Sequence, residues 1–165
     1  MNKSRKENGF TLIEIIIVIS IIAILSSGIL YLVSTFRYGD PFKSANLLNH
    51  TMEKVRIETM SKDEKQYLYI YNMNGITYFK ISTNNDYSRA ELNEGTGTKL
   101  GRGIEITYKK TDELEKKLRD TEHISLFFMK SSGAFGSDFE YIKFIGSSKE
   151  VILYCVKETG RHYIE

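Results

Sequence analysis

The sequence has 165 residues, which is enough for one domain with a short appendage. Its composition, 41% apolar and 27% charged, excludes a long disordered chain and a polytopic membrane protein. The single cysteine excludes an internal disulfide and a zinc site built on a cysteine pair. The formal net charge of +2 arises within residues 1–9 and residues 10–165 balance to zero, so the body of the chain is not expected to attract nucleic acid.

The most apolar segment runs from Phe10 to Val33 and contains one charged residue, Glu14. As a helix it would span roughly 36 Å at ~1.5 Å per residue, enough for a ~30 Å hydrocarbon layer with some tilt. It is longer than the apolar part of a secretory signal peptide, which has about 7–15 residues. Because basic residues precede it, the positive-inside tendency predicts a cytoplasmic N-terminus and an exported C-terminal part. We therefore predict a transmembrane helix over residues 10–38.

The acidic residue Glu14 has two interpretations from the residues alone. An ionisable group at the centre of a membrane costs about 2.5–3.5 kcal/mol, so its presence is a hypothesis of function. Alternatively, Thr11 and Glu14 have the spacing of a capping box, and a carboxylate is favourable near the positive end of the helix dipole. Both interpretations remain open at this point.

Residues 6–14, with their glycine, phenylalanine and glutamate, are followed by an isoleucine-rich run and resemble the class III signal of type IV pilins and pseudopilins. The resemblance implies that a prepilin peptidase cleaves between Gly9 and Phe10 and methylates Phe10, so that residues 1–9 are a cytoplasmic leader. It also implies that Glu14 pairs with the terminal amine of a neighbouring subunit during filament assembly. The mid-helix proline of many major pilins is replaced here by Tyr31, which favours a minor pilin or a pseudopilin.

The resemblance also implies a location and a set of partners. The chain is expected first in the inner or cytoplasmic membrane as a single-pass protein with its globular domain outside, and afterwards in a pilus or pseudopilus filament. Its expected partners are prepilin peptidase, other pilin or pseudopilin subunits, the assembly platform protein with its ATPase, and membrane lipid before assembly. The resemblance leaves open whether the filament serves a type IV pilus, competence or type II secretion.

The residues after the apolar run predict a second helical segment. Gly39 and Asp40 interrupt the first helix, Asp40 can cap a new one, and Pro41 fits its first turn. Apolar residues then recur at threes and fours, so residues 39–61 are predicted to be the amphipathic second half of the N-terminal helix. Its core-facing residues are expected to be Phe42, Ala45, Leu48, Met52 and Val55.

Residues 62–165 are predicted to form a β-rich globular domain. Alternation begins at Tyr67, and Asn74-Gly75 predicts a two-residue hairpin turn. In that register Leu68 faces Ile81, Ile70 faces Phe79, Tyr71 faces Tyr78 and Tyr69 faces Lys80. The tyrosine-rich face of this hairpin could bind a ligand, but a sheet surface or a contact between sheets is the more ordinary interpretation.

The middle of this domain is predicted to be irregular. Residues 82–103 are polar and carry several glycines, which favours a surface loop, followed by a strand at Ile104–Tyr108. The charged stretch Asp112–Asp120 has Leu114 and Leu118 four residues apart, which predicts a short exposed helix.

The C-terminal part is predicted to consist of strands, and Cys155 within them is expected to be a buried small apolar residue. Helix first and sheet afterwards indicates an α+β fold, with an antiparallel sheet or two sheets packed on the helix. The predicted strands are Ile124–Met129, Phe139–Ile145, Val151–Val156 and Arg161–Ile164.

A second resemblance lies in residues 128–136 together with Thr159-Gly160-Arg161. These residues are similar to the minor pseudopilins related to the H subunit of secretion systems and to FimT-like pilins. The similarity implies two facing β-sheets packed on the helix. It also implies candidate DNA contacts, because some FimT-like tails bind DNA, and here these contacts would be Lys157, Arg161 and His162.

The sequence contains no catalytic motif, and its histidines, His50, His123 and His162, are scattered without cysteines or paired carboxylates at ligand spacing. We therefore expect no enzymatic activity, no metal and no cofactor. Three functions are considered: a structural subunit of a filament, a DNA-binding minor pilin for DNA uptake, and a signal-anchored extracytoplasmic domain without a filament role.

Overall fold

The computed structural model describes residues 12–37, 39–93, 95 and 97–165, without the side chains of residues 25–37 and of Arg89. The chain divides into two units after Arg37. The predicted cleavage residues Gly9 and Phe10 and the predicted cap residue Thr11 lie outside the described residues.

The first unit contains helix α1, Leu12–Arg37. Its side chains from residue 12 to residue 24 are exposed within this unit, and most of them are isoleucine, leucine or valine. None of the helices in the described part of the chain combines the length and apolar character needed to cross a membrane.

The second unit begins with helix α2, Pro41–Ser61, which is a helix separate from α1. Asp40 lies before it in an extended conformation, and its carboxylate accepts a hydrogen bond from the Phe42 backbone N–H at 3.0 Å. Pro41 occupies the first turn, where its missing N–H costs nothing. The prediction that Gly39, Asp40 and Pro41 end one helix and begin another is thus confirmed.

The inner face of α2 matches the predicted stripe at four of its five positions. Ala45, Leu48, Met52 and Val55 have no exposed surface, whereas Phe42 is 55% exposed, so its predicted burial was wrong. Pro41 is buried instead and takes the inward position at the start of the helix.

The first sheet is antiparallel with the strand order β3-β2-β1-β6. Its central hairpin has the predicted register, in which Leu68 pairs with Ile81 and Tyr71 pairs with Tyr78. Asn74 and Gly75 both have positive φ, 54° and 70°, as a two-residue turn of this type requires. The strands are β1 (Tyr67–Met73), β2 (Ile76–Ser82), β3 (Thr98–Arg102) and β6 (His123–Phe127).

The second sheet is also antiparallel, with the order β5-β4-β7-β8-β9. The predicted C-terminal strands are all present, with ends that shift by at most two residues. The strands of this sheet are β4 (Glu105–Lys110), β5 (Lys116–Lys117), β7 (Phe139–Ile145), β8 (Glu150–Val156) and β9 (Arg161–Ile164).

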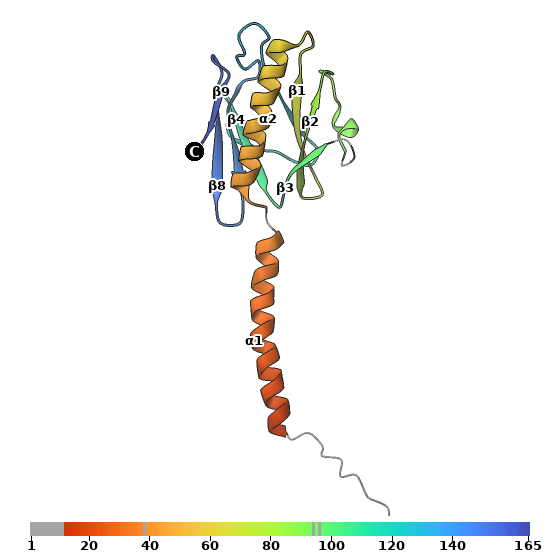
Figure 1. Ribbon diagram of the computed structural model, residues 1–165, viewed down its shortest axis with the longest axis vertical. Coiled ribbons are helices and arrows are strands. Elements are labelled where there is room, and N and C mark those ends of the chain that lie inside the picture. Colours follow the sequence, from red (N-terminus) through yellow and green to blue (C-terminus); the bar gives the residue numbers. More distant parts are fainter. Residues whose placement is uncertain (1–11, 38, 94, 96) are drawn as a thin grey trace, which may run out of the picture. The chain divides into compact units, whose positions relative to one another are not determined.

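The core lies where α2 meets both sheets. Figure 1 shows α2 with β8 and β9 on one side and β1, β2 and β3 on the other. The buried stripe of α2 joins one apolar cluster with the inner residues of both sheets, including Leu68, Ile106 and Phe144. The predicted α+β class with two sheets is therefore confirmed for this unit.

The loop predicted at residues 82–103 contains two elements that the sequence did not reveal. They are the short helix Arg89–Glu91 and strand β3, which pairs with β2 through an irregularity between Thr77 and Tyr78. Strand β3 has a weak sequence signature because its alternation is short and is interrupted by Gly101. Backbone pairing with β2, rather than local propensity, makes this segment a strand.

The helix predicted at Asp112–Asp120 is absent, so this prediction was wrong. Asp112 has a φ of 63°, which a helix does not allow, and β5 pairs with β4 instead. The Leu118 N–H donates to the Ile106 carbonyl at 2.9 Å, and its side chain is 1% exposed, whereas Leu114 is 86% exposed. Burial of Leu118 against the sheet stabilises the chain more than a helical contact between Leu114 and Leu118 would.

The tyrosine-rich face of the hairpin is a packing surface. Tyr69, Tyr71 and Tyr78 are buried in a small cluster with Leu92. The Tyr69 hydroxyl donates to the Asn84 carbonyl at 2.8 Å, and the Tyr71 hydroxyl donates to the Asn93 carbonyl at 2.9 Å. The contact is made with the loop that follows β2, so this face is packed inside the domain, against a loop rather than against a second sheet.

Candidate functional site

The N-terminal candidate site is built on the first turn of α1. Glu14 lies there with an exposed side chain, where the backbone N–H groups of the helix start favour a negative charge. Its apolar neighbours Ile13 and Ile15 are also exposed. A helix surface of this kind is unfavourable in water, so it marks an interaction surface for lipid or for other apolar helices.

Residues 4–30 match the family model described as the prokaryotic N-terminal methylation motif. The match supports a type IV pilin or pseudopilin. It includes Gly9, Phe10 and Glu14, and it implies processing by prepilin peptidase and assembly with other pilin subunits. No curated protein and no solved structure matches the chain.

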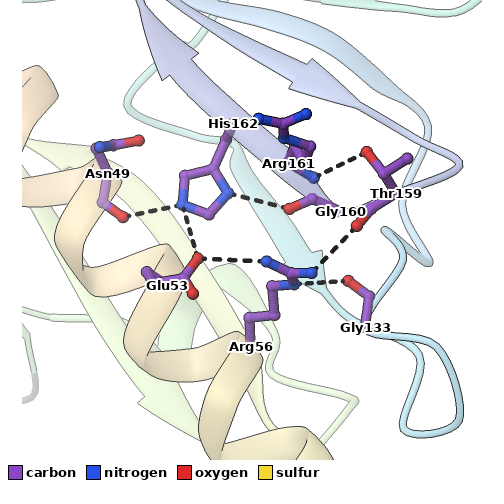
Figure 2. Close-up of polar contacts among 8 residues, drawn as sticks. All are labelled: Asn49, Glu53, Arg56, Gly133, Thr159, Gly160, Arg161 and His162. Carbon is purple, nitrogen blue, oxygen red and sulfur yellow. Dashed lines mark hydrogen bonds and ion pairs between the residues drawn. The ribbon is translucent and has the colours of Figure 1, made fainter.

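A second cluster of polar contacts joins α2 to the C-terminal turn of the domain (Figure 2). The Arg56 guanidinium donates to the Gly133 carbonyl at 3.1 Å and to the Thr159 carbonyl at 3.3 Å. One side chain of α2 thereby holds two loops that are far apart in the sequence. Both loops lie in the segments for which the sequence predicts a similarity to minor pseudopilins, and that similarity stays a prediction.

The two loops touch each other through their glycines. Gly133 and Gly160 have positive φ values of 67° and 66°. A Cβ on Gly160 would lie 1.8 Å from the Gly133 carbonyl oxygen, so a larger residue does not fit there. The glycines therefore serve a backbone contact, which Arg56 reinforces from the helix.

His162 completes this cluster from strand β9. Its side chain is 3% exposed and points toward α2 (Figure 2). Nε2 lies 3.1 Å from the Asn49 carbonyl oxygen, and Nδ1 lies 3.1 Å from the Gly160 carbonyl oxygen. The Glu53 carboxylate is 3.7 Å from Nε2 and 3.6 Å from the Arg56 guanidinium.

The candidate DNA contacts do not share one surface. Lys157 forms an ion pair with Asp138, whose carboxylate raises the pKa of the lysine. Arg161 is exposed, while His162, the next residue of the strand, is turned into the domain. DNA binding stays a prediction. Of its three candidate residues, Lys157 and Arg161 are exposed cations.

Metal binding and thiol reactivity can both be examined for the residues that the structure describes. They contain no group of three or more histidine, cysteine, aspartate or glutamate residues that could hold a metal ion. Cys155 is a free, buried cysteine, and burial raises the pKa of its thiol to about 12. The thiol is therefore protonated at neutral pH, which agrees with the predicted role as a small apolar residue.

Sequence reasoning missed the part of this cluster that α2 contributes. Asn49, Glu53 and Arg56 follow one another at spacings of four and three, so one flank of the predicted helix carries all of them. That spacing was visible in the sequence. Their partners in the C-terminal turn were not, because more than a hundred residues separate Arg56 from Thr159.

Proposed function

We propose that the chain is a structural subunit, a minor pilin or a pseudopilin, of a type IV pilus, competence or type II secretion filament. The observation that carries this proposal is the methylation motif at residues 4–30. The α+β domain with two antiparallel sheets is compatible with a pilin-like domain. Tyr31 stands at the position where many major pilins have a proline, and this supports a minor rather than a major subunit.

In this proposal the precursor is stored in the membrane before assembly. Residues 10–38 anchor it, with the leader of residues 1–9 in the cytoplasm and the globular domain outside. Prepilin peptidase cleaves between Gly9 and Phe10, where a glycine without Cβ lets an extended backbone enter a protease cleft. Methylation of Phe10 leaves a cationic amine at the new N-terminus.

Assembly then pairs two opposite charges in an apolar environment. The Glu14 carboxylate of an incoming subunit pairs with the Phe10 amine of a neighbour already in the filament. The attraction is stronger at low dielectric constant, and leaving either charge without a partner there is costly. The pair thereby fixes the axial position of the subunit, while the exposed isoleucines of α1 exchange lipid for neighbouring helices.

The first experiment is mass spectrometry of the mature protein, which is expected to begin at methylated Phe10. A Gly9→Ala variant is expected to keep its leader and to migrate without the shift that processing causes. A purified native chain that still begins at Met1 would contradict the proposal.

The second experiment separates processing from assembly. Glu14→Ala is expected to be cleaved normally but to be lost from sheared filaments, because the neighbour's amine has no counter-ion. Ser20→Ala is the matched control, since Ser20 lies on the same helix and its hydroxyl donates to the Ile16 carbonyl of that helix. Equal incorporation of both variants would refute the pairing.

A further inference from the structure

The C-terminal strand β9 ends the second sheet with an open edge. It pairs with β8 and lies at the margin of the domain (Figure 1). Glu165, just after β9, and Ile152 of β8 exchange both of their backbone hydrogen bonds, at 2.9 and 3.1 Å. Because backbone groups point to alternate sides along a strand, the N–H and C=O groups of His162 and Ile164 point away from β8. Within the described part of the chain, these outward groups have no hydrogen-bond partner.

The other edges of the two sheets are covered or very short. At β3 the Arg102 carbonyl accepts a hydrogen bond from the Gly39 N–H at 2.6 Å, and at β6 the Phe127 carbonyl accepts one from the Gly136 N–H at 2.9 Å. Strand β5 has only two residues. Among the described strands, β9 is therefore the edge whose backbone is left open, and such an edge can pair with another strand.

The side chains of this edge are complementary to a second copy of themselves. Arg161, Tyr163 and Glu165 are exposed and share the outer face of the sheet. The cation lies two residues before Tyr163 and the anion two residues after it, and neither forms an ion pair with another described residue. In an antiparallel pair centred on Tyr163, each arginine therefore lies opposite a glutamate, which is a favourable cross-strand pair. Charges that protect an edge from pairing would instead repel a second copy.

We propose that β9 is a self-association edge, through which two copies of the chain pair antiparallel about a two-fold axis at Tyr163. On each side of the axis, His162 of one copy and Ile164 of the other exchange two backbone hydrogen bonds. The two five-stranded sheets thereby become one continuous sheet. A two-fold contact closes on itself, so it produces a dimer and not a fibre. The proposal is independent of the filament role, because it uses no residue of α1.

The same pairing extends a row of tyrosines on the outer face of the sheet. Tyr141, Tyr154 and Tyr163 lie opposite one another on β7, β8 and β9. The ring centroids of Tyr141 and Tyr154 are 6.1 Å apart, and those of Tyr154 and Tyr163 are 5.3 Å apart. The row ends at Tyr163, whose side chain is 53% exposed. In the dimer the Tyr163 side chains of the two copies become cross-strand neighbours, so the aromatic contact continues across the axis.

A hollow beside β9 provides room for the second strand. Its volume is about 410 Å³, and it is lined by Val156, Thr159, Arg161, His162 and Tyr163. In the proposed register, Glu165 of the second copy lies opposite Arg161, at this hollow. Its walls are largely apolar, so filling it removes apolar surface from water and favours association.

The first test is disulfide formation in the full-length chain, in detergent micelles under mild oxidation. Tyr163→Cys places two thiols at the axis, where directly opposed residues have Cα atoms about 4.5 Å apart, within the range of a disulfide. A cross-linked dimer is expected on a non-reducing gel. Arg161→Cys is the matched control on the same face, because its two cysteines would lie roughly 13 Å apart along the strands. The native Cys155 is buried and is kept in both variants. Absence of the Tyr163→Cys cross-link, or equal cross-linking of both variants, would overturn the proposal.

The second test exchanges the two charges and measures dimerisation of the full-length chain by analytical ultracentrifugation in detergent. Arg161→Glu and Glu165→Arg each place like charges opposite one another at two positions, so each is expected to weaken dimerisation about tenfold or more. The double variant restores unlike pairs and is expected to recover the native affinity. Both residues are exposed, so an unchanged circular dichroism spectrum is expected for every variant.

Three results of this second test would overturn the proposal. The first is a native chain that stays monomeric up to its solubility limit, which would leave the edge for an extended segment of another protein. The second is a double variant that associates as weakly as the single variants. The third is equal association of the native chain and all variants, which would assign the contact to α1 or to the micelle.

Discussion

Substitution of Gly160 by alanine tests the contact between the two glycine loops. Gly160 has a φ of +66°, and an added Cβ would lie 1.8 Å from the Gly133 carbonyl oxygen and 2.9 Å from its carbonyl carbon. Both are backbone atoms, which cannot rotate away as the end of a side chain can. We expect the two loops to separate in Gly160→Ala.

The expected loss of stability has two parts. A non-glycine residue in the left-handed region costs about 1 kcal/mol. Separation of the loops also strains the hydrogen bonds that Arg56 donates to Gly133 and Thr159, each worth about 1.5–3 kcal/mol when fully formed to a charged donor. Because the Arg56 side chain is partly exposed, water replaces part of this loss. The expected total is about 3 kcal/mol.

Two other glycines provide matched controls. Gly75 has a similar φ of +70° but no atom within 4 Å of an added Cβ, so Gly75→Ala is expected to lose only about 1 kcal/mol. At Gly133 the nearest atom to an added Cβ is the Met60 sulfur at 2.6 Å, which is the flexible end of a side chain. Gly133→Ala is therefore expected to fall between the other two.

The assay is urea unfolding of the full-length variants in detergent, followed by circular dichroism. The free energy of unfolding is expected to be highest for the native chain and to decrease in the order Gly75→Ala, Gly133→Ala and Gly160→Ala. If Gly160→Ala does not fold, Arg56→Met still measures the hydrogen-bonded part without any backbone clash. A Gly160→Ala variant no less stable than Gly75→Ala would refute the close-contact argument.

Three further predictions concern the domain. Leu118→Ala is expected to cost about 2–5 kcal/mol and Leu114→Ala less than about 0.5 kcal/mol in urea unfolding, and similar losses would contradict the burial difference. Cys155 is expected to resist alkylation at neutral pH until denaturant is added, and rapid labelling of the native chain would contradict its burial. The Glu115 carboxylate, which accepts from the Tyr141 hydroxyl at 2.8 Å, raises the pKa of Tyr141 to about 12. This contact stabilises the fold below about pH 10 and is lost as the pH rises toward 12, so Glu115→Gln is expected to lower the pH at which Tyr141 ionises in an ultraviolet titration.

The sequence by itself determined the features that depend on local backbone chemistry. The break at Asp40 and Pro41 follows from capping and from the fixed φ of proline, and the turn at Asn74 and Gly75 follows from their tolerance of positive φ. The hairpin register then followed from the two-residue period, because a slip by one residue would turn its apolar side chains to the wrong face. The methylation motif is likewise a matter of local spacing.

The tertiary structure decided every feature whose partner lies far along the chain. Strand β3 forms because its backbone pairs with that of β2. Leu118 is buried because its backbone binds that of Ile106 in the sheet, although the residues on either side of it in the sequence are charged. The free-energy difference between helix and strand that a residue's intrinsic propensity provides is smaller than the free energy of such a tertiary contact. Propensity alone therefore cannot predict these outcomes.

The junction of α2 with the C-terminal turn is the clearest case. The sequence placed Arg56 on a helix and Gly160 in a turn, but no periodicity relates these positions. Only the packing of α2 on both sheets brings the Arg56 guanidinium to Gly133 and Thr159, and the His162 ring to Asn49. A hydrogen bond depends on distance in space, which the folded chain sets and which local sequence patterns do not contain.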